Sequence, residues 1–165
     1  MILIPHILLG ALIGLIIPRQ YWLVFIIAFA SHFLLDAIPH YEYTIQLIRD
    51  RLKERKGVLN IFGGKEAFLV LGKIATDFLL GMLIVISLVW FSPAKQYALV
   101  GALSAALPDG LLTLYWVTKT PLLEKLARFH RFVHPKNNKN TPLLWGISTQ
   151  LIVGLIAIFL IIYYR

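Results

Sequence analysis

Histidine and aspartate residues recur in the apolar parts of this chain at spacings that suit a metal site. His32 and Asp36 are four residues apart, so a helix would place both side chains on one face. An imidazole nitrogen and a carboxylate oxygen are both ordinary ligands of zinc and manganese. The pair could therefore bind a divalent metal, or it could be a structural Asp–His pair that neutralises itself inside the protein.

Two further candidate sites follow along the chain. Lys73 and Asp77 repeat the spacing of four residues, either as functional groups or as an ion pair tolerated in a cavity. Asp109 lies between Pro108 and Gly110, and a proline removes a backbone hydrogen bond from a helix. A kink that served only packing would explain the proline but would not require a carboxylate. We therefore expect a break in a helix that presents Asp109 to a functional site.

A basic segment later in the chain carries a second histidine pair. His130 and His134 would share one face of a helix, and Arg128 and Arg131 beside them are suited to binding phosphate oxygens. The alternative is a basic loop whose histidines lie at the headgroup surface of a membrane.

The composition rules out an ordinary soluble enzyme. Of the 165 residues, 59% are hydrophobic and 15% are charged, and the mean hydropathy is +0.78. Soluble domains carry about 25% charged residues, so this chain cannot cover itself with a water-facing surface. The absence of cysteine excludes disulfides, iron–sulfur clusters and thiolate zinc sites, and it leaves His, Asp and Glu as the metal ligands.

Five apolar stretches approach the length of a membrane-spanning helix, which needs about 20 residues to cross a hydrocarbon core about 30 Å thick. The stretches are residues 2–17, 21–38, 67–91, 96–117 and 143–164. We expect a single all-α transmembrane domain over residues 1–165, built as a polytopic bundle of about five helices with polar loops at 39–66 and 118–142. Apolar residues at every third or fourth position of 45–52 predict a helix in the membrane interface, or else a solvated charged loop.

Small residues in two of these stretches predict how the helices pack. Gly10 and Gly14 form one pair spaced by four residues, and Gly101 and Ala105 form another. Such pairs let two helices approach closely, and we expect the contact to lie within one molecule rather than between molecules.

The basic residues are distributed unevenly between the two sides of the membrane. Arg19, Lys95 and Arg165 lie on one side, and twelve basic residues lie on the other. The twelve are Arg49, Arg51, Lys53, Arg55, Lys56, Lys65, Lys119, Lys125, Arg128, Arg131, Lys136 and Lys139. Because cytoplasmic loops are enriched in Lys and Arg, we expect the N-terminus and both long loops in the cytoplasm and the C-terminus outside. Topology thereby accounts for the net charge of +8, and no nucleic-acid partner is expected.

The ionisable residues within the apolar stretches all fall in the cytoplasmic half. They are His6, His32, Asp36, Lys73, Asp77 and Asp109. A charged side chain near the bilayer centre costs about 2.5 to 3.5 kcal/mol, so scattered structural residues would not be expected to gather on one side. The distribution predicts a pocket that opens toward the basic side of the membrane.

Three motifs resemble those of a known family. They are Ser31-His32-Phe33-Leu34-Leu35-Asp36, Ala106-Leu107-Pro108-Asp109 and His130-Arg131-Phe132-Val133-His134. They are similar to motifs of small bacterial inner-membrane proteins known as membrane-bound metal-dependent hydrolases, whose patterns run approximately S-H-x-x-x-D, L-P-D-x-D and H-R-G-x-T-H. The resemblance spans most of the chain, although Leu111 stands where the family has a second aspartate. It implies a polytopic helical protein with His and Asp ligands for one or two divalent metals that hydrolyses a phosphoester.

The first hypothesis is therefore a metal-dependent hydrolase in the inner membrane that acts on a phosphoester of a lipid or isoprenoid headgroup at the cytoplasmic leaflet. The metal would be zinc, manganese or magnesium, and the partners would be anionic or phosphorylated membrane lipids. Its candidate metal ligands are His32, Asp36, Asp77, Asp109, His130 and His134. Its candidate catalytic residues are His6 and His40 for proton transfer and Lys73, Arg128 and Arg131 for phosphate.

Two other classes of function use the same residues differently. A transporter would use them as a relay for protons or metal ions, but it would need polar groups in both halves of the membrane or a movable barrier. A non-catalytic membrane module would use the basic loops to recruit a cytoplasmic or anionic-lipid partner, which leaves His32 and Asp109 without a role. The sequence leaves the oligomeric state open.

Overall fold

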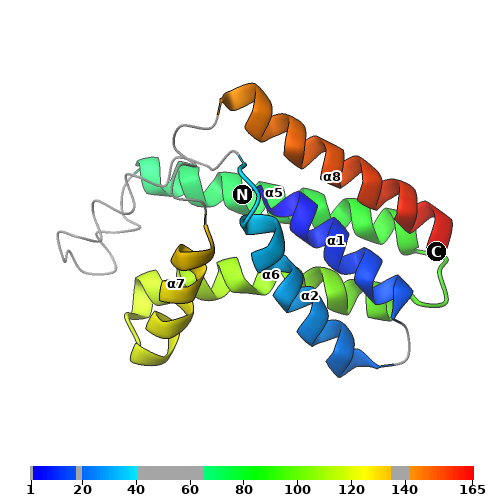
Figure 1. Ribbon diagram of the computed structural model, residues 1–165, viewed down its shortest axis with the longest axis horizontal. Coiled ribbons are helices and arrows are strands. Elements are labelled where there is room, and N and C mark those ends of the chain that lie inside the picture. The colour runs from blue at the N-terminus through cyan, green and yellow to red at the C-terminus, as the bar shows by residue number, and fades with distance from the viewer. Residues whose placement is uncertain (1, 18–19, 41–64, 135–141) are drawn as a thin grey trace.

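The chain folds into helices. The computed structural model describes residues 2–17, 20–40, 65–134 and 142–165. Within these ranges there are six helices and no strand, which confirms the all-α class (Figure 1). The helices are α1 (Leu3–Ile16), α2 (Tyr21–Asp36), α5 (Lys65–Val89), α6 (Lys95–Thr118), α7 (Pro121–Val133) and α8 (Leu143–Tyr164). The interfacial helix expected at 45–52 lies outside the described residues.

Three of the helices are long and apolar enough to cross a membrane, over Leu71–Val89, Lys95–Tyr115 and Leu144–Tyr164. The first two helices are shorter than the expected spans, since α1 has 14 residues and α2 has 16. Prolines follow both helices in the sequence, at positions 18 and 39, and the residue before a proline disfavours the helical conformation. By length, the described part of the chain therefore gives three candidate spans where the sequence predicted five.

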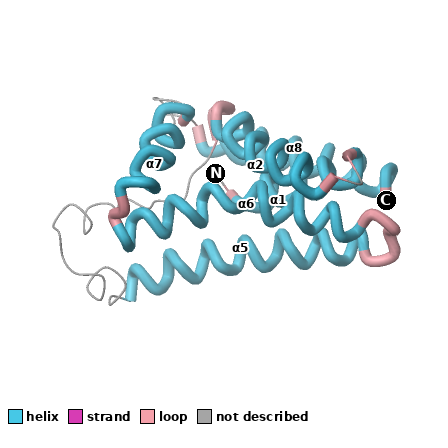
Figure 2. Tube along the Cα trace, turned by 90° about the horizontal axis from the view of Figure 1, so that it is seen from below, coloured by secondary structure: helices cyan, strands magenta, loops and turns pink. Residues whose placement is uncertain are grey.

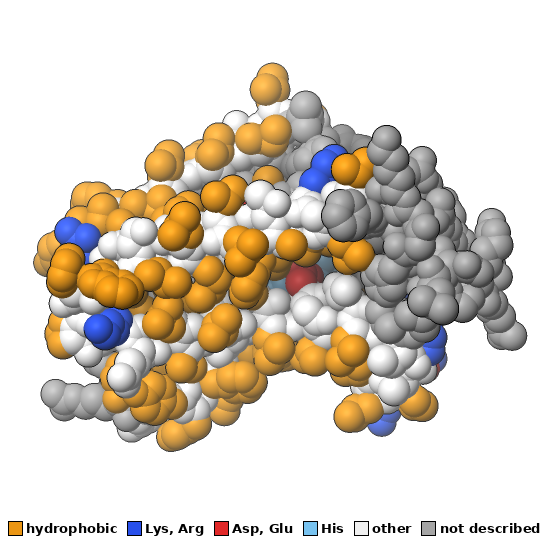
Figure 3. Space-filling view, turned by 180° about the vertical axis from the view of Figure 1, so that it is seen from behind, with side chains coloured by type: hydrophobic (Ala, Val, Ile, Leu, Met, Phe, Trp, Pro, Cys, Tyr) orange, Lys and Arg blue, Asp and Glu red, His pale blue; other side chains and the backbone are white. Residues whose placement is uncertain are grey.

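Helix α1 lies at the centre of the bundle, in contact with α2, α5, α6 and α8. Its side chains Ile7 and Leu8 are buried, and the same apolar cluster includes Val85, Ala102 and Ile161 from three other helices. The outer faces of α5 and α8 expose many large hydrophobic side chains, and Figure 3 shows that such side chains cover much of the described surface. Helices that are hydrophobic on all sides are typical of a protein surrounded by lipid.

Glycines at the crossing of α1 and α6 confirm the predicted close contact within one molecule. A Cβ atom added to Gly10 would meet the carbonyl oxygen of Gly101, and it would lie 2.6 Å from the Cβ atom of Ala105. A Cβ atom added to Gly101 would meet the carbonyl oxygen of Gly10. Only glycine fits at these two positions, so the two backbones can pack directly against each other.

The second polar stretch, expected as a loop, contains helix α7. Lys119 ends α6 in the left-handed conformation with φ of 54°, and its N–H donates to the Tyr115 carbonyl. Pro121 then starts α7, a position where the missing N–H of proline is tolerated. The chain turns sharply between the two helices, and α7 lies across the direction of α5 and α6 in Figures 1 and 2.

Candidate metal centre

Four side chains from three helices converge where α2 and α6 meet α7. His32 and Asp36 come from α2, Asp109 comes from α6, and His130 comes from α7. One possible ligand atom of each lies within 4.8 Å of the others. The Nε2 atoms of His32 and His130 lie 3.6 and 3.7 Å from Asp109 Oδ1. We refer to these four residues as the His/Asp cluster.

The carboxylate of Asp36 is the hub of the cluster. Its Oδ2 atom lies 2.7 Å from His130 Nε2, 3.0 Å from His32 Nε2 and 3.1 Å from His134 Nε2. Its Oδ1 atom lies 3.3 Å from the Nε2 atom of His6, from α1. Four imidazoles from three parts of the chain, α1, α2 and the end of α7, thus surround one carboxylate.

Backbone carbonyls fix the orientation of His32, which is one of these four imidazoles, and of the nearby His40. His32 Nδ1 lies 2.8 Å from the Ala105 carbonyl, and His40 Nδ1 lies 2.6 Å from the Ile38 carbonyl. A carbonyl can only accept a hydrogen bond, so each Nδ1 carries the proton and donates it. The Nε2 atom of His32 then faces the carboxylates as a possible ligand, and such an outer hydrogen bond is the usual partner of a metal-binding histidine.

The donor atoms of the cluster fit a metal ion. His32 Nε2 and Asp36 Oδ1, together with both ring nitrogens of the neighbouring His6, are buried and make no hydrogen bond, because the short contacts of His32 and His6 to Asp36 lack hydrogen-bond geometry. A buried polar atom without a partner costs about 1 to 3 kcal/mol, and a bound ion would supply the missing partner. Neutral imidazole and carboxylate suit zinc or manganese. This buried His/Asp group could therefore hold a metal ion.

A second group of possible ligands shares Asp36 with the first. Ligand atoms of Asp36, His40 and His134 also lie within 4.8 Å of one another. His134 follows the last residue of α7, and its ring stacks on that of His130 with centroids 4.9 Å apart. The spacing of four residues thus brings His130 and His134 to the same carboxylate, although only the first of them lies inside the helix.

Asp109 is the member of the cluster that reaches the surface of the protein. It is 28% exposed, whereas His32, Asp36 and His130 are buried. In Figure 3 an acidic side chain and a histidine are visible in a hollow of the apolar surface.

The expectation of a broken helix at Pro108 was wrong, because α6 runs through Pro108 from Lys95 to Thr118. Pro108 is buried within the bundle, where packing can hold a helix together despite one lost hydrogen bond.

Asp77, an expected ligand, lies outside both groups of possible ligands among the described residues. Its Oδ2 atom accepts a hydrogen bond from the backbone N–H of Leu3, at the start of α1. The carboxylate therefore satisfies one of the free N–H groups at a helix N-terminus, where negative charge is favourable. Asp77 anchors the end of the helix that carries His6.

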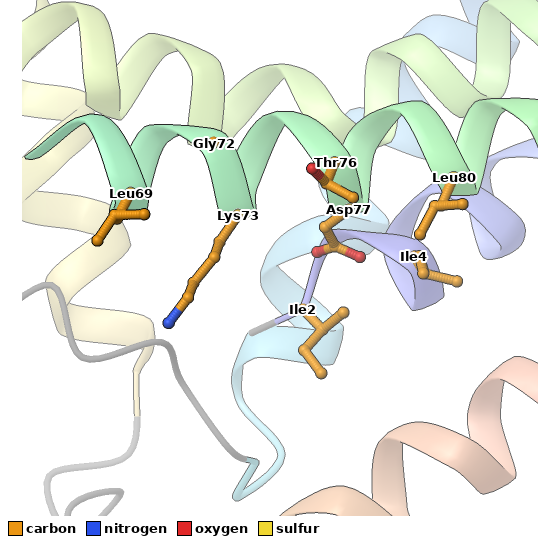
Figure 4. Close-up of a pocket in the computed structure, with 8 residues that line it drawn as sticks. All are labelled: Ile2, Ile4, Leu69, Gly72, Lys73, Thr76, Asp77 and Leu80. Atoms are coloured by element: carbon orange, nitrogen blue, oxygen red, sulfur yellow. The ribbon is translucent and has the colours of Figure 1, made fainter. Parts of the chain in front are cut away.

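Lys73 lies in a pocket between α5 and the start of α1, beside Thr76 and Asp77 (Figure 4). The pocket has a volume of about 580 Å³, and its other lining residues are apolar or glycine. No member of the His/Asp cluster lines it among the described residues. The structure therefore places Lys73 and Asp77 in one feature and the cluster in another.

The expected phosphate-binding arginines lie on the exposed side of α7. Arg128 donates two hydrogen bonds to Glu124 Oε1, at 2.6 and 3.1 Å, and these bonds raise the pKa of Arg128. Arg131 is also exposed. His130 is buried on another side of the same helix, so neither exposed arginine points toward the cluster with it.

Sequence reasoning missed the two backbone carbonyls that orient His32 and His40. A carbonyl group leaves no residue-type signal, and only packing brings Ala105 against His32.

Comparisons of the chain with models of known families, with curated proteins and with solved structures found no match. The site therefore has to be interpreted from its own chemistry.

Proposed function

We propose that this protein is a metal-dependent hydrolase of the inner membrane that cleaves a phosphoester of a lipid or isoprenoid headgroup at the cytoplasmic leaflet. The observation that carries the proposal is the convergence of buried imidazole and carboxylate donors around Asp36. The three motifs that resemble membrane-bound metal-dependent hydrolases contribute these same residues. We further propose that α1 and α2 are shorter membrane helices, which with α5, α6 and α8 make five in all.

Each residue of the cluster has a role in this proposal. His32, Asp36, Asp109 and His130 hold the metal, with His32 presenting Nε2 because its Nδ1 proton is held by Ala105. A divalent metal would supply Lewis acidity toward the phosphoryl group and would lower the pKa of water toward neutrality. His6, whose Nε2 lies 3.3 Å from Asp36, is placed to take up or release a proton.

The position of the cluster favours a substrate whose reactive group lies near the membrane surface. The cluster lies near the start of α1 and the end of α2, the two helices that are shorter than a full span. The exposed part of Asp109 gives access to it. A lipid headgroup can reach such a site while its chains stay in the bilayer, whereas a water-soluble substrate would gain nothing from this location.

The test combines metal analysis with hydrolysis. Purified wild-type protein should carry a stoichiometric divalent metal, and Asp36→Ala should lose it because three imidazoles lose their shared carboxylate. Asp77→Asn is the matched control, since Asp77 is also a buried aspartate but lies outside the cluster. With a phosphorylated diacylglycerol or polyisoprenoid as substrate, wild type should release phosphate and His32→Ala should not.

The proposal fails if wild-type protein holds no stoichiometric metal, or if His32→Ala hydrolyses as fast as wild type. Uptake of metal ions or protons into proteoliposomes, lost in Asp36→Ala without any hydrolysis by wild type, would favour the transporter instead.

A further inference from the structure

Helix α7 divides its surface between faces of different chemistry. Ala127 and His130 are buried on the side that contacts α2 and α6. Leu122 and Phe129 are seven residues apart, which places them on one face, and they are 79% and 49% exposed. A single exposed leucine is ordinary on any protein surface, but here a row of apolar side chains lies next to the row that enters the site.

Phe132, which is 84% exposed, lies at the border of the apolar row, and the remaining face of α7 is basic. Arg128 and Arg131 are three residues apart and exposed, and Lys125 is exposed between Phe129 and Phe132. Glu124 is the one acidic residue of the helix, so three positive charges outnumber it. An apolar row beside a basic row is the pattern of a helix that lies in the interface of a membrane containing anionic lipid.

The orientation of α7 agrees with such a position. It lies across the direction of α5 and α6 in two perpendicular views (Figures 1 and 2), so it would run along the membrane surface if those helices cross the bilayer. Its apolar row continues onto α2, where the ring of Phe33 meets that of Phe129 edge to face with centroids 4.9 Å apart. Helix α2 in turn exposes Leu34, which is 72% exposed.

We propose that α7 docks on an anionic lipid leaflet and that this docking holds His130 in the His/Asp cluster. Leu122 and Phe129 enter the acyl region, while Lys125, Arg128 and Arg131 meet the lipid phosphates. A lipid leaflet fits better than a protein partner, because it offers an apolar layer and a negatively charged layer side by side along the whole length of the helix.

Docking and metal binding are thereby coupled. Of the four residues in the cluster, His130 comes from α7, and it makes the shortest contact to Asp36 at 2.7 Å. Whatever favours the docked position of α7 also favours metal binding, and metal binding favours docking to the same extent. The coupling rests on the proposed metal site, whereas the lipid contact itself does not.

The natural chain has no cysteine, so single cysteines can be labelled uniquely with an environment-sensitive fluorophore. Leu122→Cys reports the apolar row, and Glu124→Cys is the matched control from the other exposed side of the same helical turn. The full chain is reconstituted in vesicles of phosphatidylcholine alone or of an equal mixture with phosphatidylglycerol. We expect a blue-shifted emission, quenched by brominated acyl chains, at position 122 in the anionic vesicles and a water-like emission at position 124.

Zinc affinity is then measured in both kinds of vesicle for unlabelled protein. Wild type should bind zinc about 5-fold or more tightly in the anionic vesicles, the lower end of ordinary coupling between sites. A variant with Lys125→Gln, Arg128→Gln and Arg131→Gln together should lose most of that difference while it keeps its affinity in phosphatidylcholine. A general concentration of zinc at the anionic surface would instead act equally on both proteins.

The outcomes separate this inference from the proposed function. Water-like emission at both positions in both vesicles overturns the docking, and it would point to a protein partner for the exposed face. Lipid contact at position 122 with equal zinc affinities in the two vesicles overturns the coupling. Absence of zinc binding in every vesicle refutes the metal site, while the fluorescence still decides whether α7 docks.

Discussion

Two buried aspartates, Asp36 and Asp77, have different roles because different groups pack against them. Asp36 and Asp77 are both buried carboxylates in apolar helices, with exposed fractions of 1% and 5%. Asp36 faces imidazoles of α1, α2 and α7, whereas Asp77 faces the free N–H groups at the start of α1. The same residue type therefore serves a possible metal site in one place and a helix end in the other.

Asp77→Ala should destabilise the protein without emptying the metal site. The N–H of Leu3 would lose its acceptor inside the protein, which costs about 1 to 3 kcal/mol of unfolding free energy. Denaturant unfolding in detergent micelles, together with elemental analysis of the folded variant, measures both effects. Asp77→Asn should lose less stability because its amide oxygen can still accept the bond. A folded Asp77→Ala protein without metal would contradict this division of roles.

Replacement of His6 should lower activity with little change in stability. Its ring is fully buried, stacks on His32 with centroids 4.1 Å apart, and has two nitrogens without hydrogen bonds. His6→Phe keeps the stacking and relieves the unpartnered Nδ1 but removes the Nε2 contact to Asp36, so the unfolding free energy should stay within about 1.5 kcal/mol of wild type. If His6 moves a proton in hydrolysis, kcat should fall by about 100-fold to 10,000-fold with metal content unchanged.

Both parts of this prediction are measured on one preparation, by unfolding and by phosphate release. His6→Phe with wild-type kcat would remove His6 from the chemistry and leave it a packing residue. The loss of metal from a folded His6→Phe protein would make it a ligand instead.

The sequence predicts which residues lie close together within one helix, but it does not predict contacts between residues of different helices. The interval of four residues places His32 beside Asp36, at 3.0 Å in the structure. Lys73 and Asp77 have the same interval, yet nothing in the sequence indicates that Asp77 faces the start of α1. His6 also meets Asp36 only because α1 packs against α2, a contact that depends on the whole bundle.

At the element scale, the crossing of α1 and α6 supports the site. Gly10 and Gly101 lie in direct backbone contact, one turn of α1 beyond His6 and one turn of α6 before the Ala105 carbonyl that orients His32. Helix packing and the geometry of the cluster are therefore linked.

Gly10→Leu should separate the two helices and weaken the site. The leucine side chain would meet the Gly101 carbonyl and the Ala105 side chain, and overpacking of this kind costs about 1 to 3 kcal/mol or more. Metal affinity should fall as well, because His6 and the Ala105 carbonyl move apart. Gly72→Leu in α5 is the control, since a Cβ atom there meets nothing within 4 Å. Thermal unfolding and zinc titration compare the variants, and equal behaviour of both would refute the role of the crossing.

The sequence predicted the positions of the apolar helices better than their lengths. Hydrophobic length located the apolar helices, because a long apolar run without charge is typical of a helix that crosses a membrane. It overestimated α1 and α2, whose ends are set by local backbone preference near prolines rather than by hydropathy. It gave no sign of α7, whose 13 residues are too few and too charged for a span, and only the spacing of His130 and His134 suggested a helix there, with a loop as the alternative.

At the scale of the whole molecule, the basic residues of α7 and those near the C-terminus lie at opposite ends (Figure 1). Arg165 donates to the Leu88 carbonyl near the end of α5, so the C-terminus is adjacent to the turn that leads to Lys95. Among the described residues, one end therefore carries Lys119, Lys125, Arg128 and Arg131, and the other carries Lys95 and Arg165, as the sequence separates them. This arrangement agrees with α5, α6 and α8 crossing one membrane side by side.

Single cysteines at the two ends test the proposed orientation. Lys95→Cys removes a positive charge from the outer side, so it can only strengthen the bias that places the other end in the cytoplasm. Lys125→Cys lies on α7 among eleven other basic residues of its side, so that bias persists. Both lysines are exposed and the chain has no cysteine of its own. A membrane-impermeant maleimide should label Cys at position 95 in intact spheroplasts and at position 125 only after permeabilisation. The reverse pattern would put the cluster on the outer side, where a substrate in the cytoplasmic leaflet could not reach it. Labelling of both positions in intact spheroplasts would mean that the charge distribution does not set a single orientation.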